Sequence, residues 1–269
     1  MAAFTYIGER LNTHRETFQK CVDDRDLKSV RKEAARQQRR GATHLDFNTG
    51  ANKDKEIDEM LWLLDAILPK LSPAAGVVID TSSTDCLRRA LQRVGKREGT
   101  IINAVNNDPA RIADVLDLAK EFDAGVIAVL SGASAAPRSS DERLNLAAQL
   151  HRQIKAAGVS DERIFFDPQV LPLAFDSAQP KAVLETVRGI RHLWPGAHTL
   201  AGLSNVSFNL PRRSLLNSAF LAMLLESGVD SLICDPCDKK LRATLLASRA
   251  LLDQDDFLAT YLSEITPED

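Results

Sequence analysis

The chain has 269 residues, of which 44% are hydrophobic and 26% are charged, and its formal net charge is −3. This composition is typical of a folded globular protein. The slight negative charge argues against nucleic acid as a partner, because phosphate binding needs a basic surface. No apolar run approaches the roughly 20 residues that cross a bilayer, and the first residues lack the basic start of a signal peptide. Four scattered cysteines do not indicate a disulfide framework, so we expect a cytoplasmic protein that does not bind membranes.

Short apolar runs alternate with amphipathic stretches along the whole chain. The runs predict eight strands, at Phe4–Gly8, Thr43–Phe47, Gly76–Asp80, Thr100–Val105, Gly125–Leu130, Arg163–Asp167, His198–Leu203 and Ser231–Cys234. They favour Ile, Val, Leu and Phe without strict alternation, which is typical of parallel strands covered on both faces.

Helical patterns separate these strands, and the clearest lie at Asp54–Lys70, Asn107–Glu121, Asp141–Ala157 and Pro211–Ser227. Gly158 and Gly228 follow two of them, as helix C-terminal glycines do. Strands separated by helices indicate parallel β-α-β units. Eight units in a chain of this length predict one α/β domain over residues 1–269, folded as a (β/α)8 TIM barrel. An open doubly wound sheet is the alternative, and length alone also allows two domains. We expect the last dozen residues to form a frayed tail.

Short polar residues gather at the carboxyl ends of the predicted strands. They are Glu9, Asn12, Asp46, Asn48, Asp80, Asn103, Asn106, Asp167, Ser204, Asn205 and Asp235. In a barrel these ends face one mouth, where active sites lie. Taken singly, each of these residues is better explained as a turn former or a helix cap. Asp80 and Asp167 each end a strongly apolar strand, which favours a function for this pair.

A ring of carboxylates and amides with little positive charge suits a ligand that is rich in N–H groups. A pterin presents an amino group, ring N–H donors and a carbonyl along one edge, and Asp and Asn side chains can match them. A phosphosugar would call for glycine-rich loops at a helix N-terminus, and the chain has no such motif. The five histidines do not have the spacing of metal ligands, so we expect no tightly bound metal.

Six motifs, in order, resemble those of the pterin-binding methyltransferases. This family includes methyltetrahydrofolate:corrinoid/iron–sulfur protein methyltransferase and the folate module of cobalamin-dependent methionine synthase. The motifs are Ile7-Gly8-Glu9-Arg10-Leu11-Asn12, Gly41-Ala42-Thr43-His44-Leu45-Asp46-Phe47-Asn48, Val78-Ile79-Asp80-Thr81-Ser82, Ile101-Ile102-Asn103-Ala104-Val105-Asn106, Phe166-Asp167-Pro168 with Leu171-Pro172, and Gly202-Leu203-Ser204-Asn205-Val206-Ser207-Phe208. The resemblance spans about Ile7 to Leu251.

The resemblance implies a dihydropteroate synthase-like barrel, usually a homodimer, with tetrahydrofolate or 5-methyltetrahydrofolate in the mouth. It implies that the pterin is held by Asp80, Asn103 and Asp167, with Glu9 and Asn12 touching it, and that Asn205 reaches the folate N5 region. Asp46, Asn48 and Ser204 complete the expected folate-binding set, and Asn205 and Asp167 are the expected catalytic residues. Asn209 departs from the family, many members of which have glycine there, so the shape of that loop is open.

The implied reaction moves a methyl group between folate N5 and the cobalt of a corrinoid. A tertiary amine leaves poorly, so the protein must orient the methyl group and stabilise charge at N5. The chain has no corrinoid-binding Asp-x-His-x-x-Gly motif, so we expect a corrinoid-carrying partner protein. The sequence leaves open the direction of transfer, the identity of the partner and whether the folate carries a polyglutamate tail.

Two other functions are alternatives to methyl transfer. Dihydropteroate synthase shares the pocket but needs a lysine at strand seven and a Ser-x-Arg near strand eight, which are missing here. A non-catalytic folate-binding subunit would keep the pocket without methyl transfer.

Arg212 and Arg213 fit either an anion contact or a solvated helix start. Cys234 and Cys237 have Cys-x-x-Cys spacing, for which a structural turn is favoured over a redox or metal role.

Overall fold

The described part of the chain, residues 4–132 and 136–265 of a computed structural model, contains a closed barrel of eight parallel strands in the order β1 to β8. The strands are β1 (Thr5–Asn12), β2 (His44–Asn48), β3 (Gly76–Asp80), β4 (Thr100–Val105), β5 (Gly125–Val129), β6 (Ile164–Asp167), β7 (His198–Gly202) and β8 (Ser231–Cys234). The predicted barrel is confirmed and the open sheet is excluded. Each strand end agrees with the prediction to within one residue, except that β1 continues to Asn12.

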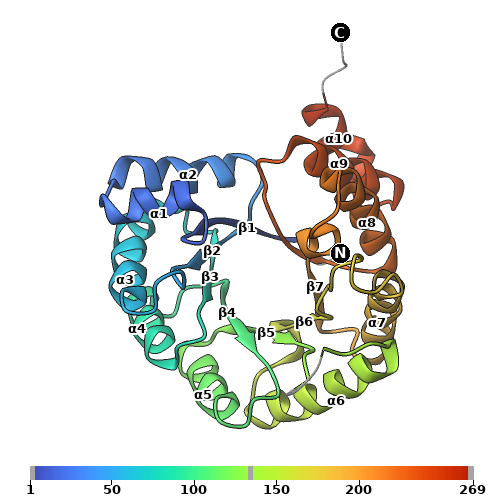
Figure 1. Cartoon of the computed structure of the whole chain (residues 1–269), viewed down its shortest axis with the longest axis horizontal. Coiled ribbons are helices and arrows are strands. Elements are labelled where there is room, and N and C mark those ends of the chain that lie inside the picture. Colours follow the sequence, from blue (N-terminus) through green and yellow to red (C-terminus); the bar gives the residue numbers. More distant parts are fainter. Residues whose placement is uncertain (1–3, 133–135, 266–269) are drawn as a thin grey trace.

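Helices surround the barrel on all sides (Figure 1). They are α1 (Glu16–Asp23), α2 (Leu27–Arg39), α3 (Glu56–Ile67), α4 (Thr84–Val94), α5 (Ile112–Phe122), α6 (Ser140–Ala156), α7 (Gln179–Leu193), α8 (Arg213–Ser227), α9 (Lys239–Leu251) and α10 (Ala259–Glu264). Short 3-10 turns lie at Leu68–Lys70, Asp161–Arg163, Leu203–Ser207 and Asp256–Leu258. No helix in the described ranges is long and apolar enough to cross a membrane.

Local sequence signals set several helix boundaries. The side chains of Asp26, Ser83, Ser139 and Asp238 each accept a backbone N–H in the first turn of α2, α4, α6 and α9, which is the usual N-cap. Gly158 and Gly228 follow α6 and α8 with φ of +91° and +105°, as predicted.

Three helices start later than predicted, and α3 begins at Glu56 rather than Asp54. Before α5, the Asp108 side chain accepts the N–H of Ala110 at 3.0 Å, and this turn delays the helix to Ile112. Before α8, Arg212 has a left-handed φ of +54°, so the helix begins at Arg213, two residues later than predicted.

Apolar residues fill the inside of the barrel and the layer between strands and helices. Six buried side chains from different strands meet inside the barrel, namely Ile7, Val78, Ile101, Ile127, Phe165 and Leu200. Larger clusters pack the outer faces of the strands against the helices. The barrel is therefore a packed core with its polar residues left to the ends.

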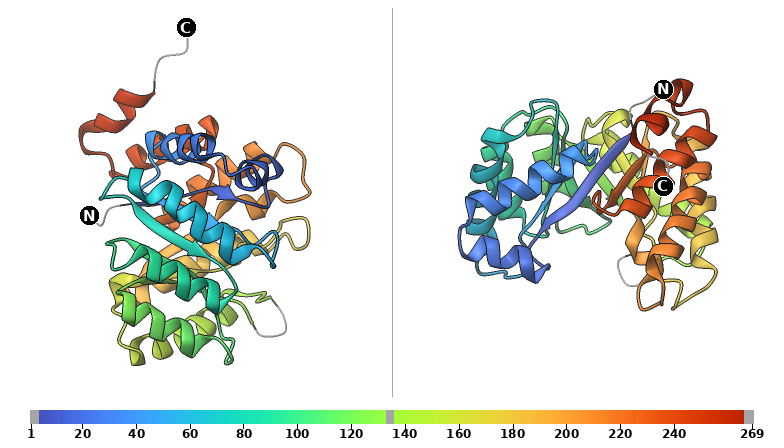
Figure 2. Two further views of the ribbon diagram at one scale, coloured as in Figure 1. Left: turned by 90° about the vertical axis from the view of Figure 1, so that its left-hand side faces the viewer. Right: turned by 90° about the horizontal axis from the view of Figure 1, so that it is seen from above.

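The C-terminal segment packs against α9 on the side of the barrel opposite the mouth. Figure 2 shows α10 on this side, away from the loops that follow the strands. The predicted frayed tail is wrong for α10, whose first turn is held by Asp255, because its carboxylate accepts the N–H of Thr260 and of Tyr261. Residues 266–269 lie outside the described residues.

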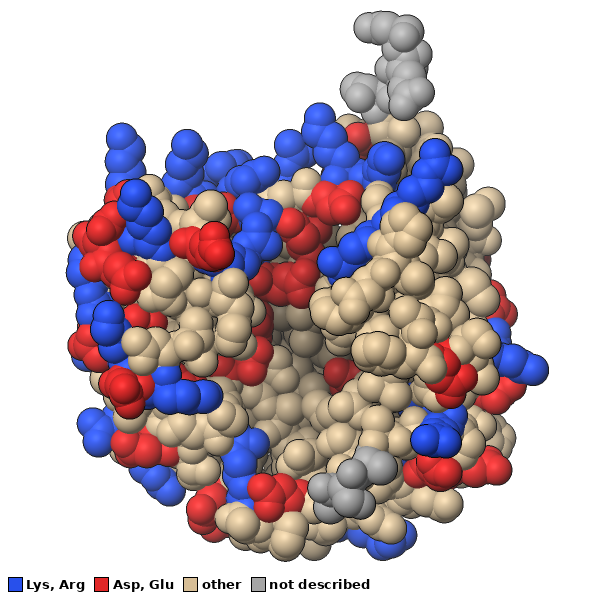
Figure 3. All heavy atoms as spheres, in the orientation of Figure 1, with Lys and Arg blue, Asp and Glu red and all other residues tan. Residues whose placement is uncertain are grey.

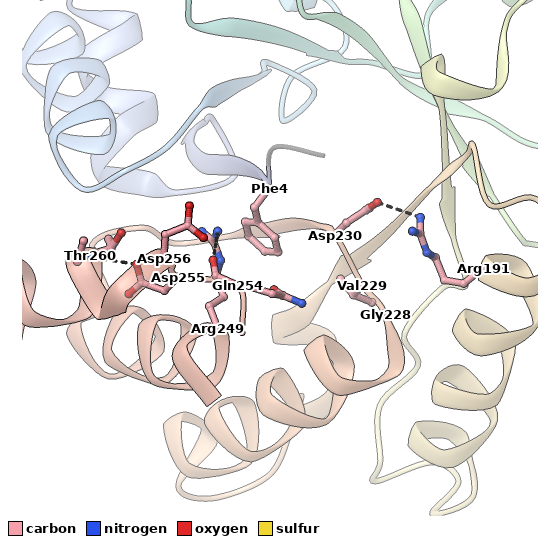
Figure 4. A pocket seen from close by; sticks show the side chains of 11 residues that line it. Phe4, Arg191, Gly228, Val229, Asp230, Arg249, Gln254, Asp255, Asp256 and Thr260 are labelled. Atoms are coloured by element: carbon pink, nitrogen blue, oxygen red, sulfur yellow. Dashed lines mark hydrogen bonds and ion pairs between the residues drawn. The ribbon is translucent and has the colours of Figure 1, made fainter. Parts of the chain in front are cut away.

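A cavity of about 570 Å³ lies between this segment, Phe4 and the residues that precede β8 (Figure 4). Both of its arginines have local partners, because Arg191 pairs with Asp230 at 3.2 Å and the Arg249 guanidinium stacks over the ring of Phe4. Active sites of such barrels lie at the mouth instead. We therefore assign this cavity to the packing of the C-terminal segment.

Gly76 offers a test of how tightly the barrel closes. A methyl group there would lie 1.9 Å from His44 Cδ2 and 2.6 Å from the Gly99 carbonyl oxygen. We expect Gly76→Ala to lower the free energy of unfolding by about 2–3 kcal/mol, because overpacking forces neighbouring strands apart. Urea denaturation measures this change. The control is Gly196→Ala on the surface, where the nearest atom is the Asp161 Cβ at 3.3 Å, and equal losses in both variants would contradict the prediction.

Candidate active site

Four of the predicted polar residues form one row across the first four strands. In the strand register Asn12 lies opposite Asn48, Asn48 opposite Asp80, and Asp80 opposite Asn103. Residues paired in this way in parallel strands point to the same side of the sheet. Asn48 Nδ2 donates to Asp80 Oδ2 at 2.8 Å. The structure therefore brings these side chains together at one edge of the mouth.

Asp46 lies one layer deeper than this row, two residues before Asn48 on β2. It is 3% exposed, and its Oδ1 has no hydrogen-bond partner among the described residues. Burial raises the pKa of Asp46 well above its usual value, the negative charge of Asp80 raises it further, and a hydrogen bond with Asn103 opposes the rise. Burial also raises the pKa of Asp80, while its bond from Asn48 lowers it. Two carboxyl groups thus share a site that is poor in positive charge.

Glu9 reaches this group because β1 contains a bulge. Gly8 pairs with Leu45 and Leu11 with Phe47, so Glu9 and Arg10 are set against a single residue of β2. A bulge of this kind changes the direction of a side chain. Burial raises the pKa of Glu9, with a further rise from Asp235, while the charges of Arg15, Arg10 and Arg213 lower it.

Gln37 and Arg10 hold the bulge in place. The Oε1 of buried Gln37 accepts the N–H of Arg10 at 3.1 Å. A Cβ on Gly8 would lie 2.4 Å from the same oxygen, so glycine is needed there. Arg10 donates to Glu33 and to Asp235, each at 2.5 Å, which ties β1 to α2 and to the loop after β8.

Asp167 ends β6. Burial raises its pKa to about 6, and a hydrogen bond from the N–H of Gln169 and the nearby charge of Arg143 limit the rise. The Gln169 bond is 2.8 Å long. Arg143 is fully buried and donates to the Pro168 carbonyl and to Gln179 Oε1, each at 2.7 Å. Arg143 therefore fixes the loop that follows Asp167.

Ser204 and Asn205 lie in the 3-10 turn after β7. Asn205 is exposed, and its Nδ2 lies 3.7 Å from where a Cβ on Gly202 would stand. Arg213 donates to the Ser204 carbonyl at 2.8 Å and to Ser207 Oγ at 3.0 Å. Arg213 is thus partly engaged in bracing this loop. Arg212 is exposed and precedes α8.

The face that holds these residues is hollowed at its centre. Figure 3 shows acidic side chains along the upper and left walls of the hollow and mostly uncharged residues on the right wall. Next to it, a cavity of about 310 Å³ is lined by Glu9, Ser204, Arg213, Ser214, Asn217, Cys234, Asp235, Asp238 and Leu241. Ser214 Oγ and Asn217 Oδ1 are buried there without a partner among the described residues.

Some predicted residues also serve the local structure. Asn12 Oδ1 accepts the N–H of His14 at 2.9 Å, which is the turn-forming role that any Asn at a strand end can have. Asp235 pairs with Arg10, and its Oδ1 accepts the N–H of Cys237 at 2.8 Å. These bonds occupy part of each side chain, so their ligand roles stay predictions.

The four cysteines are free in the described structure. Burial raises the pKa of Cys234 and of Cys237, whereas a reactive or metal-binding thiol needs a lowered pKa. The geometry therefore supports the structural interpretation of the Cys-x-x-Cys turn. Residues 4–132 and 136–265 contain no group of three or more His, Cys, Asp or Glu side chains that could hold a metal ion.

Sequence reasoning missed the residues that position the site from behind. Gln37 and Arg143 are fully buried, yet each lies in a polar helix stretch that predicts exposure. Gln169 Oε1 is buried without a partner in the described structure. The Asp-Pro motif signals the loop of Gln169, but nothing local to the sequence marks Gln37 or Arg143.

The fold and this mouth define the class of protein, a (β/α)8 barrel with a carboxylate and amide pocket at the carboxyl ends of its strands. The chain belongs to the family of pterin binding enzymes, whose model matches residues 8–235. The resemblance predicted from the motifs is thereby confirmed.

Two relatives are similar over most of this chain. Methylcorrinoid:tetrahydrofolate methyltransferase of Eubacterium limosum is 26% identical over 257 residues, which cover 95% of this chain and 93% of that protein. Methionine synthase of Mycobacterium tuberculosis is 28% identical over 254 residues, which cover 86% of this chain but only 20% of that longer protein.

Solved structures of dihydropteroate synthases share the fold. The enzyme from Clostridium difficile, determined in the presence of pteroic acid, superposes with a TM-score of 0.74 at 18% identity and covers 93% of this chain and 97% of its own. The enzyme from Coxiella burnetii, in complex with pteroic acid, has a TM-score of 0.71 at 18% identity, with coverage of 93% and 94%. At this identity the likeness shows the barrel alone.

The raised pKa of Asp167 makes stability depend on pH. Because its folded pKa of about 6 exceeds the ordinary 3.8, the native protein binds the proton more tightly than the unfolded chain. The stabilisation of the native state by this tighter proton binding is fully present below about pH 4 and is lost as the pH rises through about 6. The shift corresponds to at most about 3 kcal/mol, and less because solvent reaches this half-buried side chain.

We expect Asp167→Asn to be more stable than the parent protein above pH 6, because the amide keeps the acceptor for Gln169 without a buried charge. Urea denaturation between pH 4 and 8 should show the two proteins converging at low pH. Asp141→Asn, at an exposed position on α6, is the control and should follow the parent. Parallel pH profiles for parent and Asp167→Asn would disprove the shift.

Proposed function

We propose that this chain is a methyltransferase that moves the N5 methyl group between a reduced folate and the cobalt of a corrinoid carried by another protein. The observation that carries the proposal is the buried group of carboxylates and amides at the mouth of a pterin-family barrel. The similarity to a methylcorrinoid:tetrahydrofolate methyltransferase along nearly the whole chain supports it. The fold alone is equally compatible with other pterin chemistry.

The polar groups of the mouth fit a pterin. Asp46 Oδ1 and Gln169 Oε1 are buried acceptors without partners in the described structure, and a buried polar atom without a partner is costly. A pterin edge supplies the N–H donors that such acceptors need. On this proposal Asp46, Asp80 and Asn103 bind one edge of the ring, and Asp167 meets it from β6.

The substrate set extends around the mouth. Glu9, Asn12 and Asn48 border the ring from β1 and β2, and Ser204 and Asn205 lie at the folate N5 side. The carboxyl group of Asp167, whose pKa is raised to about 6, can hold or release a proton near neutral pH.

Asn205 is the proposed catalytic residue. When the methyl carbon leaves N5, the nitrogen keeps the electron pair of the broken bond and gains a proton; in the reverse direction N5 loses the proton and attacks the methyl carbon. The corrinoid supplies the cobalt that accepts or releases the methyl group. The exposed Asn205 amide can hydrogen-bond at N5 in both directions, and Arg213 braces the loop that carries it.

Two exposed aromatic side chains lie in loops that follow strands of the barrel. Phe175, in the loop after β6, is 75% exposed, and Phe208, in the loop after β7, is 49% exposed. Exposed aromatic side chains beside a site are typical of protein interfaces. These residues support a corrinoid-carrying protein that approaches over the mouth. We also retain, from the family resemblance, the expectation of a homodimer.

The two rival functions make different demands. A dihydropteroate synthase-like reaction needs an anion site, whereas β7 is followed by Leu203-Ser204-Asn205 without a lysine, and Asp235 after β8 is paired with Arg10. A non-catalytic folate-binding subunit would bind folate but would not change the spectrum of free cob(I)alamin mixed with methyltetrahydrofolate. That spectral assay on the full chain is the decisive experiment.

We expect Asn205→Ala to lower the rate of methyl transfer to free cob(I)alamin by about 10²-fold or more, because one hydrogen bond to the charge that develops in the reaction is lost. Folate affinity should change much less. Stopped-flow spectra of cobalt give the rate, and fluorescence titration gives the affinity. Asn145→Ala, at an exposed position on α6, is the control. An unchanged rate in Asn205→Ala would remove Asn205 from the mechanism.

A further inference from the structure

A basic groove lies beside the mouth, between the end of β1 and helices α1 and α2. Its volume is about 300 Å³, and its lining residues are Arg10, Arg15, Thr17, Phe18, Cys21, Ser29, Lys32, Glu33 and Arg36. We call it the α1–α2 groove. Figure 3 shows Lys and Arg side chains along the upper edge of the molecule, over the helices that Figure 1 labels α1 and α2.

The cations of the groove are only partly neutralised. Glu33 is its one carboxylate, and it bonds Arg10 at 2.5 Å and lies 3.8 Å from Arg36. Neither Arg15 nor Lys32 forms an ion pair with a residue in the described ranges. The groove therefore presents unpaired positive charge that an anionic ligand could meet.

The groove adjoins the proposed folate site directly. Arg15 follows Asn12 by three residues, and its N–H donates to the Asn12 carbonyl at 3.1 Å. Arg10 follows Glu9, and the charges of Arg15 and Arg10 both act on the Glu9 carboxyl. One wall of the groove is thus the rim of the mouth.

The mouth itself repels anions. Glu9, Asp46, Asp80 and Asp167 are acidic, so the carboxylates of a folate tail must lie outside it. Arg213 is an alternative contact on the opposite rim, but its guanidinium already donates to Ser204 and Ser207. The α1–α2 groove offers freer cations.

The spacing of the cations fits a γ-linked chain. Lys32 and Arg36 are four residues apart on α2 and both are exposed, so they lie about 6 Å apart along the helix axis. A γ-glutamyl unit has two more chain bonds than an ordinary peptide unit, so successive carboxylates also repeat at about 6 Å. Consecutive glutamates can therefore meet consecutive turns of α2.

We propose that the α1–α2 groove binds the γ-linked glutamate tail of the folate substrate, with Arg15, Lys32 and Arg36 pairing with its carboxylates. This inference rests on the proposed function, since it assumes a folate in the mouth. The substrate class it names is a polyglutamylated reduced folate.

The test compares tetrahydrofolate carrying one and three glutamates on the full-length chain, by calorimetric titration. We expect the triglutamate to bind roughly tenfold more tightly, because exposed ion pairs each contribute modestly. The preference should shrink as NaCl is raised. In the double variant Lys32→Gln/Arg36→Gln the preference should fall to near parity, because the triglutamate loses more affinity than the monoglutamate.

The matched control is Arg88→Gln/Arg89→Gln, which removes the same charge from exposed positions on α4. Equal binding of both folates by the parent protein would overturn the inference, as would a preference that survives in the groove variant. An equal loss of the triglutamate preference in the control would also overturn it, because net charge alone would then explain the preference.

If the groove variant slowed methyl transfer to a protein-bound corrinoid but kept the preference, the inference would be overturned and the groove would belong to an acidic carrier protein. Failure of both folates to bind would overturn the proposed function itself.

Discussion

The mouth of this barrel is organised by the cost of burying carboxyl groups beside one another. Asp46 is almost inaccessible, and burial raises the pKa of Glu9, Asp46, Asp80 and Asp167. Moving such groups out of water is expensive unless hydrogen bonds or opposite charges compensate. The protein supplies amides for this purpose, because Asn48 bonds Asp80 and Asn103 bonds Asp46. A ligand with several N–H donors can supply what is still missing.

Much of the surrounding structure serves to hold these groups in position. The bulge of β1 turns Glu9 toward the mouth, and it depends on Gly8, on the buried amide of Gln37 and on the two ion pairs of Arg10. Arg143 performs the same task for Asp167, through the carbonyl groups of the following loop. Arg213 does so for Asn205. Gln37, Arg143 and Arg213 lie on three different helices, so helix packing and site geometry are coupled.

The sequence predicts the strands and their polar ends well because both depend on residues that are neighbours along the chain. A buried parallel strand is a short apolar run, and its carboxyl end must lie at the mouth once the sheet closes. The braces are different, since Gln37 and Arg143 are polar residues in helices and become buried only through contacts with distant segments. Long-range contacts of this kind leave no periodic signal. Helix α10 is missed for a different reason, because its start is fixed by the local bonds of Asp255 rather than by an apolar pattern.

The carboxylates of the mouth and Asn205 differ in their exposure to solvent. The carboxylates that we propose for the pterin edge are buried or partly buried, whereas Asn205 is exposed on a turn. A hydrolytic or condensing enzyme that reacts two small molecules gains by enclosing its reacting atoms. A reaction whose second reactant is bound to another protein needs the reacting atom at the surface, because a macrocycle cannot descend into a barrel whose interior is packed. On the proposed function, the buried end of the folate gives affinity and its exposed end meets the partner protein. The exposed position of Asn205 is consistent with the proposed transfer between two proteins.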